Sequence, residues 1–199
     1  MPDPGHEPCP RCLYQRRVCL CAEIPAIANA TRVVIVRHHL ERHRSSNTGR
    51  LAHLALANSA LVEYGGPGRG TDGFATDSLV LDGAHLLYPL GEPAGVAPSP
   101  PPQQIVVLDA TWSQARRMYR KLAPVRALPV LHVAVPDGAA ARARLRESPG
   151  EGMISTIEAI AAALRLLDGD AVAAPLERLY DLAVARARAT GRLNAGPGR

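Results

Sequence analysis

Two uninterrupted apolar runs constrain the fold of this chain more than any other feature of its sequence. They are Val33–Val36 (VVIV) and Ile105–Leu108 (IVVL), and neither alternates apolar with polar residues. A strand that is apolar on both faces is buried on both faces, which is typical of parallel sheets covered by helices. We therefore predict buried strands at 32–37 and 105–108 in an α/β fold.

The remaining segments alternate between helical and extended composition. The expected helices are 51–62, 112–122, 156–167 and 176–189, and the expected further strands are 78–81 and 130–135. The Gly-rich stretch 65–73 is typical of a flexible loop, and the Pro-rich stretch 95–102 of an extended connector. Strands separated by helices favour a mostly parallel sheet flanked by helices. We expect a small N-terminal knuckle over 1–25 and one main domain over 26–199.

Arginine dominates the charge of the chain. The sequence has 23 Lys and Arg against 18 Asp and Glu, which gives a net charge of +5, and Lys121 is its only lysine. The planar guanidinium binds phosphate through two parallel hydrogen bonds. This basic excess is compatible with a polyanionic partner such as a nucleic acid.

The sequence also indicates where the protein works. It has no run of about 18 apolar residues, the length that a membrane-spanning helix needs. Its start, MPDPGHEPCP, lacks the basic and apolar regions of a signal peptide. We expect a cytoplasmic protein without membrane contact or an obligatory protein partner, and favour a monomer.

All four cysteines lie in CPRCLYQRRVCLC, as Cys9, Cys12, Cys19 and Cys21. Four thiolates at such short spacings can enclose one tetrahedral Zn²⁺ and leave no open coordination position. The pattern therefore predicts a structural zinc site. An iron–sulfur centre, disulfides and free thiols are the alternatives, and a reducing cytosol disfavours disulfides.

The segment IVVLDATWSQARRM joins a strand to a helix. Asp109 closes the strand, and Thr111 with Gln114 forms a T-x-x-Q capping box. In open α/β sheets, ligands bind beyond the carboxyl ends of strands, at helix N-termini. Asp109 is thus a candidate catalytic or ligand-binding carboxylate, and Trp112 can stack on a base. Alternatively, Asp109 completes a turn and Trp112 packs the helix onto the sheet.

Two further segments carry candidate binding groups. In ISTIEAIAAAL, Ser155 and Glu158 form a second capping box, whose amides either bind a ligand or only cap the helix. The stretch HHLERHRSSNTGR is basic, and is either a solvated loop or a phosphate-binding one. The candidate RNA contacts are Arg16, Arg17, Arg37, Arg42, Arg44, Arg50 and Arg116.

Four of these segments in order, CPRCLYQRRVCLC, SNTGRLA, LDATWSQARRM and ISTIEAIAAAL, resemble the motifs of DTW-domain proteins. The D-x-T-W signature stands here as Asp109, Thr111 and Trp112, and the resemblance covers most of residues 9–167. It implies a tRNA-uridine aminocarboxypropyltransferase. Such an enzyme transfers the 3-amino-3-carboxypropyl group of S-adenosylmethionine to N3 of a uridine, at position 47 of the variable loop, and releases methylthioadenosine.

The resemblance also implies a site and a fold. Asp109 would act as a base or orient a substrate, and the arginines would hold the tRNA backbone. The cofactor pocket would be lined by Leu108, Thr111, Trp112, Ser155 and Thr156. The family is similar to SPOUT-class enzymes, whose C-terminal region is knotted. The alternatives are a SPOUT-like RNA methyltransferase, an rRNA aminocarboxypropyltransferase and a non-catalytic zinc-ribbon RNA-binding protein.

Overall fold

The fold is an α/β sandwich around one parallel sheet. The computed structural model of the chain describes residues 4–66, 81–89, 96–134, 145 and 153–190. These residues form a five-stranded sheet in the order β2-β1-β4-β3-β5, and its neighbouring strands pair in parallel. The strands are β1 (Arg32–His38), β2 (Ser59–Tyr64), β3 (Ala84–Leu87), β4 (Gln104–Asp109) and β5 (Val130–Leu131). The predicted parallel α/β fold is confirmed.

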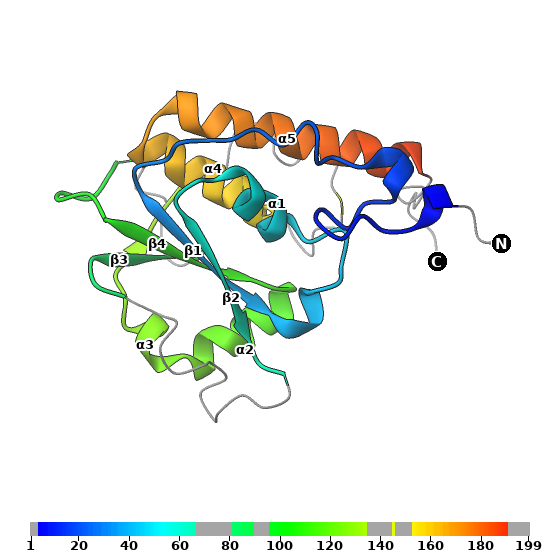
Figure 1. Cartoon of the computed structure of the whole chain (residues 1–199). Helices are drawn as coiled ribbons and strands as arrows, with labels where there is room; N and C mark the ends of the chain where they lie inside the picture. The colour runs from blue at the N-terminus through cyan, green and yellow to red at the C-terminus, as the bar shows by residue number, and fades with distance from the viewer. Residues whose placement is uncertain (1–3, 67–80, 90–95, 135–144, 146–152, 191–199) are drawn as a thin grey trace.

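Helices cover both faces of the sheet (Figure 1). One face carries α1 (Thr48–Ala55) and α4 (Thr156–Leu167), with α5 (Asp170–Ala189) packed on α4. The other face carries α2 (Trp112–Lys121) and the short α3 (Ala123–Arg126). Single turns of 3₁₀ helix occur at η1 (Pro4–His6), η2 (Arg16–Val18) and η3 (His39–Glu41).

The two central strands explain the apolar runs in the sequence. Alternate residues of β1 and β4 point to opposite faces of the sheet, as the pleat requires. Ile35 and Ile105 enter the core beneath α1, α4 and α5, whereas Val34 and Val106 enter the core above α2 and α3. Both strands are therefore buried on both faces, which confirms the predictions for 32–37 and 105–108.

Two predicted helices match closely and a third begins earlier than expected. The predictions 112–122 and 156–167 correspond to α2 and α4. The helix predicted at 176–189 begins at Asp170 instead, with Pro175 inside it. Proline removes a backbone donor and normally interrupts a helix. Here burial of Ala173 and Leu176 on either side of it favours a continuous helix.

The helix predicted at 51–62 is wrong in its second half. Helix α1 ends at Ala55, and residues from Ser59 onward form β2 beside β1. The Ala- and Leu-rich composition hid this change, because strand formation depends on pairing that composition does not reveal. The Asn29 side chain holds the intervening turn: its Oδ1 accepts a hydrogen bond from the backbone N–H of Asn58 at 3.0 Å.

Other predicted elements are only partly described. The strand expected at 130–135 contains just Val130–Leu131, and residues 132–134 are not extended into the sheet. Of the strand expected at 78–81, residues 78–80 lie outside the described residues, and so does most of the loop at 65–73. Residues 96–102 contain neither helix nor strand, as expected for a connector. The short strand β3 was not predicted.

The N-terminal knuckle is joined to the main domain through the core. Its buried residues Cys12, Tyr14 and Leu20 belong to the same apolar cluster as α1, α4 and α5, and the knuckle lies beside the end of α5 (Figure 1). Arg186 of α5 also donates a hydrogen bond to Glu23 at 2.6 Å. The boundary after residue 25 stays a prediction. None of the described helices is long and apolar enough to cross a membrane.

Candidate active site and cysteine cluster

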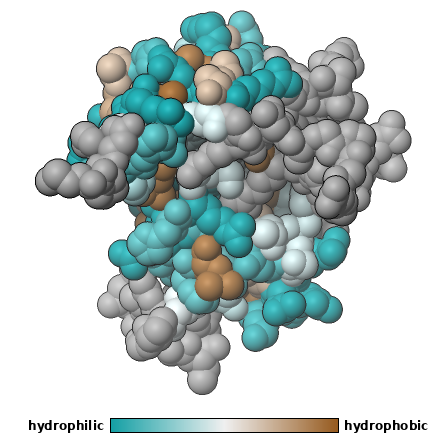
Figure 2. All heavy atoms as spheres, turned by 90° about the vertical axis from the view of Figure 1, so that its right-hand side faces the viewer, coloured by the Kyte–Doolittle hydropathy of each residue, from teal (hydrophilic) through white to brown (hydrophobic). Residues whose placement is uncertain are grey.

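A cavity of about 440 Å³ opens at the carboxyl ends of the strands. This volume lies within the range of small-molecule binding sites, roughly 300–1,000 Å³. The cavity gathers the predicted catalytic residue and every predicted cofactor-binding residue: Leu108, Asp109, Thr111, Trp112, Ser155 and Thr156. Figure 2 views the molecule from the side toward which β1 and β4 run, where much of the coloured surface is hydrophilic.

Asp109 lies at the base of the cavity and connects three elements. Its side chain is only 3% exposed. Asn47, just before α1, donates a hydrogen bond from Nδ2 to Oδ2 of Asp109, and Thr156 of α4 donates from Oγ1 to Oδ1 at 2.8 Å. Burial raises the pKa of Asp109, and these two hydrogen bonds oppose the rise because they stabilise the charged form.

Gly49 allows α1 to approach this carboxylate. A Cβ at this position would lie 2.5 Å from Cγ of Asp109 and 2.6 Å from Oδ2, closer than van der Waals contact allows. Glycine is costly within a helix, so its presence on the first turn of α1 fits a demand for close approach. Asn47 also caps α1, because its Oδ1 accepts from the backbone N–H of Arg50 at 2.9 Å. One amide side chain thus fixes both the helix start and Asp109.

Asn47 and Gly49 were not predicted as site residues. The available signal was the NTGRLA block, in which an Asn stands directly before a helix and a Gly inside it. Asparagine is a preferred N-cap residue, so the cap was readable from the sequence. The contact with Asp109 was not, because it joins residues 62 positions apart.

Both predicted capping boxes are present at the edge of the cavity. In α2, the side-chain oxygen of Gln114 accepts hydrogen bonds from the backbone N–H and the hydroxyl of Thr111, at 2.9 and 2.8 Å. In α4, a carboxylate oxygen of Glu158 accepts the same two bonds from Ser155, at 2.8 and 2.7 Å. Helix N-termini carry a partial positive charge, so two such ends meet beside the cavity.

The α2 side of the cavity is less buried. Trp112 and Arg116 line it, and Tyr88, which follows β3, lies against the same space. Tyr88 stacks on Tyr119 of α2 with ring centroids 4.8 Å apart and an interplanar angle of 11°. Burial raises the pKa of Tyr88, and the charges of Arg116 and Arg120 oppose this rise. Tyr88 was not predicted as a site residue, because β3 itself was not predicted.

The seven predicted RNA-contacting arginines differ in their surroundings. Arg37 is buried and forms an ion pair with Glu63. Arg50 donates hydrogen bonds to the carbonyls of Arg42, at 2.6 Å, and Arg11, at 3.4 Å. The remaining five are exposed. Three of these have a side-chain partner: Arg16 contacts Glu7, Arg17 contacts Gln15 and Arg44 contacts Glu41. The other two exposed arginines are Arg42 and Arg116. Contact of these arginines with RNA stays a prediction.

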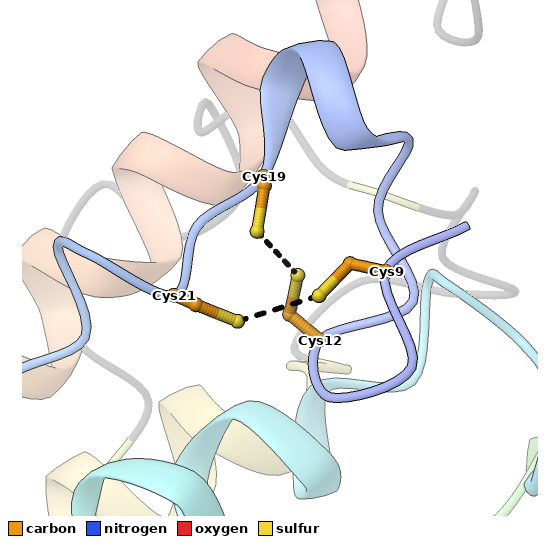
Figure 3. Close-up of side chains that lie close together, drawn as sticks. All are labelled: Cys9, Cys12, Cys19 and Cys21. Atoms are coloured by element: carbon orange, nitrogen blue, oxygen red, sulfur yellow. Dashed lines mark hydrogen bonds between the residues drawn. The ribbon is translucent and has the colours of Figure 1, made fainter. Parts of the chain in front are cut away.

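The four cysteines converge on one point (Figure 3). Their sulfur atoms all lie within 4.8 Å of one another, and the pairs Cys9–Cys21 and Cys12–Cys19 are 3.6 Å apart. In a tetrahedral site with Zn–S bonds of about 2.3 Å, neighbouring sulfurs lie about 3.8 Å apart. The thiols are not joined as disulfides. The donor set and its spacing therefore fit a four-coordinate metal such as zinc.

The surroundings of the cluster affect its thiols unequally. A hydrogen bond from the backbone of Cys12 is the main cause that lowers the pKa of Cys9 to about 6. Burial raises the pKa of Cys12, which is 1% exposed. A bound metal ion would keep all four sulfurs deprotonated. A site this enclosed, with four protein ligands, is suited to a structural role.

The parallel α/β fold, the carboxylate at a strand end and the cysteine cluster together define the class of protein. The chain belongs to the DTW domain family, whose model matches residues 6–188. Similar curated proteins are named tRNA-uridine aminocarboxypropyltransferase 2. The Drosophila melanogaster protein is 29% identical over 80% of this chain and 66% of its own length. The Macaca fascicularis and Mus musculus proteins are each 28% identical over 80% of this chain and 56% of their own.

The chain thus spans between about half and two thirds of the length of these relatives. No solved structure matches it.

Proposed function

We propose that this protein is a tRNA-uridine aminocarboxypropyltransferase that uses S-adenosylmethionine. One observation carries the proposal: Asp109, Trp112 and the start of α4 share one cavity of about 440 Å³ at the carboxyl ends of the strands. The names of the similar curated proteins support the same activity and tRNA as the substrate.

The reaction would join N3 of a uridine to the γ-carbon of the methionine moiety. The N3–C bond forms as the C–S bond breaks, the bond's electron pair returns to sulfur as methylthioadenosine leaves, and the N3 proton passes to solvent or to a base. The positive end of the α4 dipole at the cavity edge suits the carboxylate of the methionine moiety, since helix N-termini bind anions. The Trp112 indole offers an apolar face to the adenine or the uracil.

Of the two roles expected for Asp109, the surroundings favour orientation. A general base must come within about 2.6–3.2 Å of the proton that it removes. Both carboxylate oxygens of Asp109 already accept hydrogen bonds, from Asn47 and Thr156, and little of the side chain is exposed. Asp109 would then hold the starts of α1 and α4 in the positions that bind the substrates.

The decisive experiment combines the purified protein, labelled S-adenosylmethionine and tRNA. We expect methylthioadenosine and a 3-(3-amino-3-carboxypropyl)uridine in the digested tRNA, found by mass spectrometry at position 47. Accumulation of S-adenosylhomocysteine would identify a methyltransferase, and modified rRNA would identify a different substrate. A protein that binds RNA but not S-adenosylmethionine would be a binding module.

Asp109→Ala tests the site itself. We expect at least a 100-fold loss of transfer, because the starts of α1 and α4 lose their common acceptor, while circular dichroism and tRNA binding are retained. Asp109→Asn can still accept from Asn47 and donate to Thr156, so it should keep more activity if the role is orientation. Equal loss in both variants would indicate a base, and full activity in both would remove Asp109 from the mechanism.

The cysteine cluster supports structural zinc as part of this proposal. The purified protein should contain one zinc ion per chain, and Cys12→Ser should lose it and lower the Tm, while Arg17→Ala on the same knuckle should change neither. Iron with visible absorbance, or full stability of Cys12→Ser without metal, would contradict zinc.

Three further features belong to the proposal. The relation to SPOUT enzymes would imply a knot near the C-terminus of the chain. A cytoplasmic location suits a tRNA substrate and reduced zinc ligands. Sedimentation of the purified chain tests the expected monomer.

A further inference from the structure

One stretch of the chain is basic without any acidic residue. Between Asp109 and Asp137 the sequence contains four arginines and Lys121, and no Asp or Glu. Helix α2 lies within this stretch and buries Ala115 and Met118 against the sheet. Its exposed side then carries four charges, which we call the α2 basic face: Arg116, Arg117, Arg120 and Lys121.

The α2 basic face differs from the other charged helices. Helix α5 intersperses its arginines with acids, and Arg165 of α4 binds Asp170 and Glu177 of α5 at 2.8 and 2.9 Å. Among the residues that the structure describes, no acid forms an ion pair with a charge of the α2 basic face. Like charges four residues apart on a helix repel each other, so this arrangement suits an anionic partner better than solvent.

The α2 basic face runs beside the mouth of the cavity. Arg116 itself lines the cavity. At one end, burial raises the pKa of Tyr88, which follows β3, and the charges of Arg116 and Arg120 oppose this rise. At the other end, burial lowers the pKa of His38 at the end of β1; the charge of Arg117 adds to this effect and that of Glu41 opposes it. The charges therefore extend along the sheet edge from β3 to β1, across the end of β4 that carries Asp109.

An aromatic pair adjoins these charges. Tyr88 and Tyr119 are both half-buried and stacked, and Tyr88 lines the cavity. Proteins that bind single-stranded nucleic acid combine a basic track for the phosphates with aromatic rings on which bases stack. An acidic protein segment would use the charges but gives no reason for a stacked pair at the cavity wall.

We propose that the α2 basic face is the docking surface for the RNA strand that carries the target nucleotide. The strand's phosphates bind Arg117, Arg120 and Lys121, and a base next to the target stacks on the Tyr88–Tyr119 pair. This inference rests on the proposed function and deepens it, because it assigns RNA binding to a surface beside the cavity and apart from the knuckle.

The test is the double variant Arg117→Ala/Arg120→Ala. Its matched control is Arg178→Ala/Arg188→Ala, which removes the same charge from exposed positions of α5 on the other side of the sheet. We expect the first to weaken binding of a tRNA transcript at least tenfold and raise the KM for tRNA, with S-adenosylmethionine affinity unchanged. The slope of log K against log salt should fall by about 1.4–1.8, the value for two lost phosphate contacts. The control should match the wild type.

Three more variants separate the contribution of charge from that of stacking. Arg117→Lys/Arg120→Lys keeps both charges and should preserve the salt slope. Tyr88→Phe should bind tRNA like the wild type, whereas Tyr88→Leu should raise the KM severalfold because the stacking face is lost. Unchanged affinity and salt slope in Arg117→Ala/Arg120→Ala would overturn the proposal.

The outcomes also separate this inference from the proposed function. If the wild type transfers the group and both double variants behave alike, the docking surface is wrong and the function stands. If the wild type binds tRNA through the α2 basic face but transfers nothing, the docking surface stands and the function is wrong.

Discussion

The two walls of the cavity differ in how deeply they are buried and in whether their polar groups are paired within the protein. The wall formed by α1, β4 and α4 is buried, and its polar groups bind one another: Asn47 and Thr156 both donate to Asp109. The wall formed by α2 is partly exposed, and its cations have no acidic partner among the described residues. Both walls begin with a capped helix, so the difference lies in what surrounds the caps.

This difference indicates that the buried wall maintains the structure of the cavity, whereas the α2 wall is suited to binding a partner. A buried polar group must be paired because an unpaired one costs about 1–3 kcal/mol. A paired group is fixed in place but has little left to offer a ligand. The exposed cations of α2 cost little in water and remain available to an anion. We therefore expect substitutions in the buried wall to change stability and those in the α2 wall to change affinity.

The largest effect should come from Gly49→Ala. The new Cβ would overlap the Asp109 carboxylate, so α1 or β4 must shift. Overpacking of this kind costs typically 1–3 kcal/mol, and we expect transfer to fall below detection. Urea denaturation and the transfer assay measure both effects.

The double variant Gly49→Ala/Asp109→Ala is the control for the clash. Asp109→Ala removes all three atoms that the new Cβ would meet, so the second substitution should restore part of the stability lost in the first. Strict additivity of the two losses would show that Gly49 serves some other purpose than close approach.

A smaller effect is the difference between the stability losses of two variants, Thr156→Val at the start of α4 and Thr111→Val at the start of α2. Thr156→Val leaves Oδ1 of the buried Asp109 without its donor, and we expect a loss of about 1–3 kcal/mol in the free energy of unfolding. Thr111→Val removes an N-cap that water can partly replace, and should cost about 0.5–2 kcal/mol. If Thr111→Val proves the more destabilising, the buried wall is not the more rigid one.

The smallest effect is a pH dependence confined to the buried wall. The pKa of Asp109 is raised in the folded protein, so the stability tied to its protonated form is fully present below the unfolded pKa. That stability is lost as pH rises through the folded pKa. The free energy of unfolding of the wild type should therefore decline relative to Asp109→Asn as pH rises above about 4. Effects of pH on the cysteines cancel in this difference, and the opposite trend would contradict the raised pKa.

How far the sequence predicts this molecule depends on how far apart the interacting residues lie. The runs VVIV and IVVL identify the two central strands because burial on both faces is visible in the residues themselves. The two capping boxes and the four cysteines involve residues within a few turns of chain, and their spacing is equally readable. These features cover the centre of the sheet and the starts of α2 and α4.

The remainder depends on contacts between distant segments. Strand β2 was mistaken for helix because only its pairing with β1 makes Ser59–Tyr64 extended. The Asn47–Asp109 contact spans 62 residues, and the close approach of Gly49 exists only once α1 rests on β4. The family motifs brought these blocks together in order along the chain, but they did not say which atoms meet.

The Arg50 side chain has a consequence for the cysteine-rich end of the chain. Its guanidinium donates a hydrogen bond to the carbonyl of Arg11, which lies between Cys9 and Cys12 in the sequence, while its backbone N–H donates to Asn47. If the proposed zinc is bound, a chelator that removes it would loosen the anchor of the first turn of α1, the turn that brings Gly49 against Asp109. Under the proposed function, loss of the metal would then lower the transfer activity before the sheet itself unfolds.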